Sequence, residues 1–217
     1  MPAVVDKVGQ RHLACRPGPP HIFAVIFFRL IFWLWAFGAL AVGHFRLLQR
    51  LPAPAIQGIL VGLTALLLAA YFRSRPVRAA IDQRDLRGLV LFHVTRFVGF
   101  YFLHLYALGE LPYDFAVPGG YGDIVVAALA LVVVFVPMSA ALRERALTIW
   151  NVIGFIDILF VVVTAARLGR ADPFSMRALT VLPLSLLPTF LVPLLIASHL
   201  VIFTRLKHSR LSAPTSS

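Results

Sequence analysis

The chain has 217 residues, of which 60% are hydrophobic and only 13% are charged. This composition excludes an ordinary soluble domain and predicts an all-α, polytopic transmembrane helix bundle. The formal charge of +11 does not indicate a nucleic-acid partner, because nearly all Lys and Arg residues flank hydrophobic stretches. A single cysteine, Cys15, excludes an internal disulfide and has no assigned role.

Six hydrophobic stretches are long enough to cross a bilayer as helices. Turn-forming sequences separate them, such as PGPP before the first and VPGGYG before the fourth. No segment is long enough for a separate soluble domain, so we expect one transmembrane domain over residues 1–217 that ends in a short disordered tail, LSAPTSS. The predicted spans are 22–43, 55–72, 88–108, 122–142, 148–168 and 179–203.

Positive charge predicts the orientation of the bundle. With the N-terminus inside, thirteen Lys and Arg residues fall in cytoplasmic segments and five in outer segments, which favours both termini in the cytoplasm. The first twenty residues are charged and lack a continuous apolar core, so they do not read as a cleaved signal peptide. We expect the first span to act as a signal anchor in a bacterial inner membrane.

The third span, GLVLFHVTRFVGFYFLHLYAL, carries two histidines and one arginine, namely His93, Arg96 and His104. At 100° per residue, His104 lies about 20° round from His93 and roughly 16 Å further along the helix, so the two imidazoles share one face. Arg96 lies about 60° to one side of them. This face is the first candidate for a functional site. The first span contributes Arg29, expected to snorkel to the cytoplasmic headgroups, and His44 at its outer end.

The last three spans add further buried polar residues. Asp123 is predicted in the first turn of the fourth span, where a carboxylate can cap the helix, near the outer carboxylates Glu110 and Asp114. The fifth span opens WNVIGFID, which places Asn151, Gly154 and Asp157 within an arc of about 120°. The sixth is expected to be kinked and carries Pro183, Pro188, Pro193 and His199.

Depth along the helices pairs some of these residues. His93 and His199 are both predicted roughly 9 Å from the cytoplasmic ends of their spans. Arg96 and Asp157 both lie about 12 to 14 Å in, where a lone charge costs at least about 2.5 kcal/mol. We therefore predict a buried ion pair between Arg96 and Asp157.

The histidines suggest a b-type haem protein for electron transfer, with a quinone or another redox partner. His93 and His199 would ligate one haem, and His104 with His44 a second, outer one. Nearby arginines, Arg29 inside and Arg46 outside, could neutralise the propionates.

The same residues also fit a proton-coupled transporter or channel for a small molecule or ion. In that alternative Arg96, Asp157 and Asn151 form a midplane site, and His93 or His199 exchanges protons. A structural or assembly role stays open. An enzyme has the least support, since no catalytic or metal-binding motif is present.

Three stretches, LPYDFAVPGGYGD, WNVIGFID and LPLSLLPTFLVPLLIASHL, resemble uncharacterised bacterial integral membrane proteins. The resemblance covers roughly Gly88 to Phe203. It implies an inner-membrane protein of about six helices, and it implies no activity.

Overall fold

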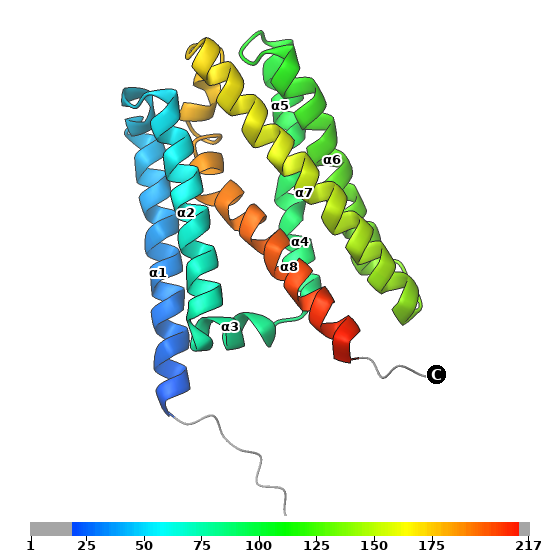
Figure 1. Ribbon diagram of the computed structural model, residues 1–217. Helices are drawn as coiled ribbons and strands as arrows, with labels where there is room; N and C mark the ends of the chain where they lie inside the picture. The colour runs from blue at the N-terminus through cyan, green and yellow to red at the C-terminus, as the bar shows by residue number, and fades with distance from the viewer. Residues whose placement is uncertain (1–18, 213–217) are drawn as a thin grey trace, which may run out of the picture.

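The computed structural model describes residues 19–212, and this part of the chain is helical, without strands. Figure 1 shows long helices that run along one another and one short helix, α3, that lies across the bundle end. The expectations for Cys15, the N-terminal segment and the last residues of the tail lie outside the described residues. The elements are α1 (Pro19–His44), η1 (Leu47–Arg50), α2 (Ala53–Arg73), α3 (Arg75–Asp82), α4 (Leu86–Phe92), η2 (His93–Val98), α5 (Gly99–Ala107), α6 (Tyr113–Phe135), α7 (Ala140–Ala171), η3 (Arg177–Thr180), η4 (Leu187–Leu191) and α8 (Val192–Ser212).

Several helices are compatible with a multi-pass membrane protein. Five segments are long and apolar enough to cross a bilayer: Ala53–Arg73, Leu86–Ala107, Tyr113–Phe135, Ala140–Ala171 and Leu187–His208. The apolar stretch of α1, Arg29–His44, is shorter. Large apolar side chains are exposed along the bundle, among them Phe37, Leu66, Phe135 and Val163, whereas charged and polar side chains are buried inside it. This inverted pattern suits a lipid environment. The start of α1 and the end of α8 lie at the same end of the bundle as α3 (Figure 1).

The third span is not one regular helix. The α-helix α4 ends at Phe92, a 3₁₀ segment, η2, covers His93–Val98, and α5 continues from Gly99. A 3₁₀ helix turns by about 120° per residue rather than 100°, so the six residues of η2 add roughly 120° of rotation. The single helical face predicted for His93 and His104 is therefore wrong.

The fourth and fifth spans begin earlier than predicted. The helix α6 starts at Tyr113 and includes the stretch VPGGYG, for which the sequence predicts a turn. Pro118 lies inside this helix, where its missing N–H removes the intrahelical bond to the carbonyl of Asp114. The helix ends at Phe135, since Val136 precedes Pro137 and is extended. Helix α7 starts at Ala140, where the hydroxyl of Ser139 accepts a hydrogen bond from the Leu142 N–H at 3.3 Å.

The predicted sixth span is irregular in its first half. Residues 187–191 form a π-helical turn, η4, and only from Val192 does α8 run as a regular α-helix. Pro193 has no N–H for the carbonyl of Thr189, and the Trp35 Nε1 of α1 donates to that carbonyl instead at 2.9 Å. The prolines therefore make this span irregular, as the predicted kink implies. Trp35 of α1 donates the hydrogen bond that the Thr189 carbonyl lacks within the helix.

Candidate functional site

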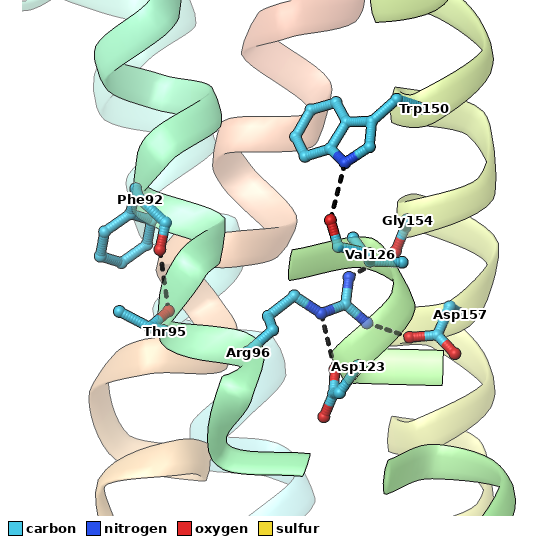
Figure 2. A network of polar contacts seen from close by, with 8 residues as sticks. All are labelled: Phe92, Thr95, Arg96, Asp123, Val126, Trp150, Gly154 and Asp157. Atoms are coloured by element: carbon cyan, nitrogen blue, oxygen red, sulfur yellow. Dashed lines mark hydrogen bonds and ion pairs between the residues drawn. The ribbon is translucent and has the colours of Figure 1, made fainter. Parts of the chain in front are cut away.

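Arg96 is the centre of a buried polar cluster formed by three segments (Figure 2). Its Nε donates to Asp123 Oδ1 on α6 at 2.6 Å, and its Nη1 donates to the carbonyl of Gly154 on α7 at 2.9 Å. The Nη2 donates to Asp157 Oδ2, also on α7. The ion pair predicted between Arg96 and Asp157 is present, and Asp123 joins it as a second carboxylate. We call Arg96, Asp123 and Asp157 the acid cluster.

The acid cluster contains one more acidic group than basic groups. Arg96 and Asp123 are 1% and 3% exposed, and the Asp157 side chain is 15% exposed. Within residues 19–212, Arg96 is the only cationic side chain paired with either carboxylate. With both carboxylates ionised the cluster carries one net negative charge. Because a buried unbalanced charge is costly, this arrangement favours binding of one proton or one further cation.

Small residues let the three segments approach closely at the acid cluster. A Cβ on Gly99 would overlap the carbonyl oxygen of Gly120, and a Cβ on Gly120 would lie 2.9 Å from the carbonyl oxygen of Gly99. A Cβ on Gly122 would overlap the carboxylate of Asp157. The glycines that resembled loop residues in the sequence therefore form the helix contact that brings Arg96 to Asp123.

The prediction that Asp123 caps the start of a helix is wrong. Helix α6 begins ten residues earlier, at Tyr113, and the residue before it is Pro112. Asp123 therefore lies in the third turn, where the backbone N–H groups are bonded within the helix. Its partner is the Arg96 guanidinium and not the helix end.

Two histidines from separate spans meet beside the acid cluster. His93 and His199 are both fully buried, and their ring centroids are 4.2 Å apart. Trp150 packs against both rings, at 5.0 and 5.6 Å between centroids, and its Nε1 donates to the carbonyl of Val126 at 3.0 Å. The three aromatic rings lie together where η2, α7 and α8 meet.

The hydrogen bonds define the tautomer of each imidazole. The Asn151 Nδ2 donates to the His199 carbonyl at 3.0 Å, so its Oδ1 accepts from the His199 Nδ1–H at 2.7 Å. The Ser198 hydroxyl donates to the Leu195 carbonyl at 2.8 Å, so its oxygen accepts from the His93 Nε2–H at 2.9 Å. His93 Nδ1 and His199 Nε2 then each carry a lone pair, and neither atom has a partner in the described chain. Both lone pairs are therefore buried inside the bundle without a donor from the described residues.

Gly154 connects the histidines to the acid cluster. A Cβ at this position would lie 2.7 Å from His199 Cε1 and 3.2 Å from His199 Nε2. The carbonyl of the same residue accepts from Arg96. The free nitrogen of His199 and the guanidinium of Arg96 therefore flank one residue of α7.

This arrangement does not fit a haem held between His93 and His199. Metal–imidazole bonds are about 2 Å long, so two rings that ligate one haem iron from opposite sides have centroids roughly 6 Å apart, with the porphyrin between them. The two rings here are in direct contact at 4.2 Å. A bis-histidine haem at this position would require the helices to separate.

The structure does not bring His44 and His104 together. Both side chains are exposed, His44 beside Phe45 and His104 beside Tyr101. Figure 1 shows α1 and α5 apart from each other, with α2 between them. Arg29, the expected inner propionate partner, is exposed on α1, and Arg46, the outer one, is exposed in the turn after it. The outer haem site therefore has no paired ligands.

A cavity leads towards the acid cluster from the bundle end opposite α3. It has a volume of about 360 Å³ and lies between η1, the first turns of α2, the last turns of α7, and η3–η4. A second void of about 20 Å³ lies against Arg96 and Asp123. Val161, Leu187 and Val192 line both spaces. The void is large enough for about one water molecule, which would place a proton carrier between the cavity and Asp123.

Three contributors to the site were not identified from the sequence, namely Asp123 as an Arg96 partner, Ser198 and Trp150. The cluster of Gly119, Gly120 and Gly122 could have indicated that Asp123 lies at a contact between helices. Small residues grouped in an apolar helix are typical of a close helix contact. No sequence signal marks Ser198 as the partner of a histidine on another span.

The bond from Asn151 to His199 gives a stability prediction. We expect Asn151→Leu to lower the free energy of unfolding by about 1–3 kcal/mol, because it leaves the buried His199 Nδ1–H without an acceptor. Thermal unfolding in detergent measures the change, with the exposed neighbour Val152→Ala as the control. Equal stability of the two variants would contradict the network.

The long apolar helices, with a charged cluster buried among them, define a helical protein compatible with a multi-pass membrane location. Within that class, the chain belongs to the family described as Domain of unknown function (DUF8737), whose model matches residues 53–207. The match includes the acid cluster and both buried histidines and begins after α1. Neither a curated protein nor a solved structure matches the chain.

Proposed function

We propose that the protein is a proton-coupled transporter of a small molecule or ion, and that the acid cluster binds the coupling proton. The observation that carries this proposal is the charge of the cluster: two carboxylates share one guanidinium at a buried position. One proton on Asp123 or Asp157 makes the cluster neutral, and its release restores a net negative charge. Such a change alters the balance between conformations that bury the cluster and conformations that open it to water.

Groups that can carry a proton lie on two sides of the cluster and support the same proposal. The cavity and the small void approach Asp123 from the end of the bundle opposite the termini. On the other side of Gly154, His199 and His93 present unprotonated nitrogens. A water molecule in the void on one side and the two imidazole groups on the other are the candidate proton carriers next to the cluster.

The proposed topology has six spans in a bacterial cytoplasmic membrane, with α1 as the first span. Helix α1 is 26 residues long, and its start and the end of α8 lie on the same side of the bundle (Figure 1). That side also carries α3, whose Arg78 donates from Nε to the Tyr71 carbonyl at 3.3 Å. The excess of Lys and Arg on this side favours its placement in the cytoplasm.

Electron transfer through haem is the less favoured proposal, because the histidines that would hold the cofactor pack against each other. A purely structural acid cluster is the remaining alternative, and the experiment below separates it from transport.

Proton movement in proteoliposomes tests the transport proposal. Vesicles loaded with a pH-sensitive dye are exposed to panels of monocarboxylates, amino acids, amines and alkali cations. We expect at least one class to drive proton movement with the wild-type protein. Asp123→Asn and Asp157→Asn should each lower that rate by about 100-fold or to the rate of protein-free vesicles, because proton-transfer groups contribute effects of that size.

Asp114→Asn is the matched control, since Asp114 is an exposed carboxylate that pairs with Arg167 at 3.6 Å. It should keep the wild-type rate. Infrared spectra should also show the C=O band of a protonated carboxylic acid that Asp123→Asn or Asp157→Asn removes and Asp114→Asn retains. Absence of both the band and solute-driven proton movement would show that the acid cluster is structural.

A further inference from the structure

The cavity that leads to the acid cluster changes in character along its depth. Its longer polar side chains lie at the outer end, where Gln49 of η1, Gln57 in the second turn of α2 and Arg177 of η3 stand beside exposed apolar residues such as Phe174. Its inner part is lined by apolar side chains, including Leu60 and Val161. Val161 lies ten residues before the end of α7, roughly 15 Å along the helix. A ligand that fills this space needs a polar head and an apolar body.

The polar side chains at the mouth are available to a ligand. Within the described chain, the side-chain amides of Gln49 and Gln57 have no hydrogen-bond partner, and the Arg177 guanidinium has no ion-pair partner. Arg177 is also the only charged side chain that lines the cavity in the described part of the chain. One positive charge beside two free amides complements an anionic head group, above all a carboxylate, which can accept from all three.

The volume limits the apolar part of the ligand. Pockets that hold drug-sized molecules measure about 300–1,000 Å³, and this cavity, at about 360 Å³, lies near the lower limit. That space suits one hydrocarbon chain and not the two chains of a phospholipid. The wall that separates it from the void beside Arg96 is itself apolar, formed by Val161, Leu187 and Val192.

We propose that this cavity binds a single-chain amphiphile with an anionic head group, with the head at Arg177 and the chain directed towards the acid cluster. Binding of this kind does not depend on transport. That the amphiphile is also the transported substrate rests on the proton-coupled function proposed above.

Three probes with the same chain and different heads test the charge preference: decanoate, decanol and decyltrimethylammonium. Binding to the purified full-length protein is measured by calorimetry below the micelle-forming concentration of each probe. We expect decanoate to bind best. Arg177→Gln should weaken decanoate binding by about tenfold, the effect of one partly exposed charged hydrogen bond, and should leave decanol binding unchanged. Arg170→Gln, at an exposed arginine of α7 outside the cavity, should match the wild type for all three probes.

A second variant tests the position of the chain. Ala165 lines the cavity, and Ala165→Phe should fill it and abolish binding of decanoate and decanol alike while the protein keeps its thermal stability. Equal affinity for all three heads, or decanoate binding that Arg177→Gln leaves intact, would overturn the proposal. Displacement of bound decanoate by dilauroyl phosphatidylglycerol at equal concentration would assign the cavity to a membrane phospholipid instead.

The two proposals fail separately. Calorimetry can find the amphiphile site while no solute moves protons, which would leave a binding protein without coupling. Proton movement driven only by solutes that do not compete with decanoate would place the transported substrate elsewhere.

Discussion

Arg96→Leu is expected to cause the largest loss of stability of any single substitution in the acid cluster, about 3–5 kcal/mol, because it leaves buried carboxylates without their cation. Asp123 is 3% exposed and loses its ionic partner among the described residues, and Asp157 loses the same partner. The carbonyl of Gly154 also loses the donor at 2.9 Å. The change is measured by thermal or denaturant unfolding in detergent.

Removing all three charges of the acid cluster should restore much of the stability that Arg96→Leu loses. Replacing a whole buried ion pair or triad by neutral groups is often close to neutral for stability, whereas removing one partner is not. We therefore expect the triple variant Arg96→Leu, Asp123→Asn, Asp157→Asn to be more stable than Arg96→Leu alone, although inactive in proton movement. The triple variant thus separates the contribution of the cluster to stability from its contribution to function.

The exposed pair of Arg167 and Asp114 provides the control. Both side chains are about two-thirds exposed and lie 3.6 Å apart. Arg167→Leu should change the free energy of unfolding by less than about 1 kcal/mol, because surface ion pairs contribute little. If Arg96→Leu were no more destabilising than Arg167→Leu, the acid cluster would not be coupled to folding.

Depth along predicted helices was enough to bring together residues from distant parts of the chain. Equal depth paired Arg96 with Asp157 and His93 with His199, and both pairs are in contact. This succeeded because a rise of about 2.0 Å per residue in a 3₁₀ helix, against about 1.5 Å in an α-helix, shifts positions by only about 3 Å over the six residues of η2. Lone buried charges also need partners. The distances along the axis therefore tolerate an error of one or two residues.

Rotation about the helix axis could not be predicted in the same way. The 3₁₀ segment that contains Arg96 changes the phase of all later residues, so His104 is exposed while His93 is buried. No residue in HVTRFV marks this change of helix type, and the segment lies against α6. The start of α6 was missed for a related reason: proline and glycine at positions 118–120 favour a loop locally, but the contact with Gly99 holds them in a helix.

That contact leads to the second large effect. A Cβ on Gly99 would overlap the carbonyl oxygen of Gly120 and lie 3.0 Å from the Cβ of Asp123. A backbone oxygen within a helix cannot move away as the end of a flexible side chain can, so Gly99→Ala must push η2 and α5 away from α6. The Arg96 to Asp123 bond of 2.6 Å lies one turn from this point and should break.

We therefore expect Gly99→Ala to destabilise the protein by about 1–3 kcal/mol through overpacking. Loss of the ion pair between Arg96 and Asp123 should add to this destabilisation. Two other glycines provide graded controls. A Cβ on Gly119 would meet only the Val161 side chain, at 3.3 Å, and a Cβ on Gly62 would meet nothing within 4 Å. Gly119→Ala should be mild, and Gly62→Ala should stabilise α2 by about 0.5–1 kcal/mol, because alanine favours a helix over glycine.

The order of the three unfolding temperatures decides whether this helix contact positions the acid cluster. Gly99→Ala should unfold first, Gly119→Ala next and Gly62→Ala last. The protonated-carboxylate infrared band should shift in Gly99→Ala alone, because only that substitution separates Arg96 from Asp123. A variant that kept both the wild-type stability and the wild-type band would mean that the close approach of Gly99 and Gly120 is not needed to hold Arg96 against Asp123.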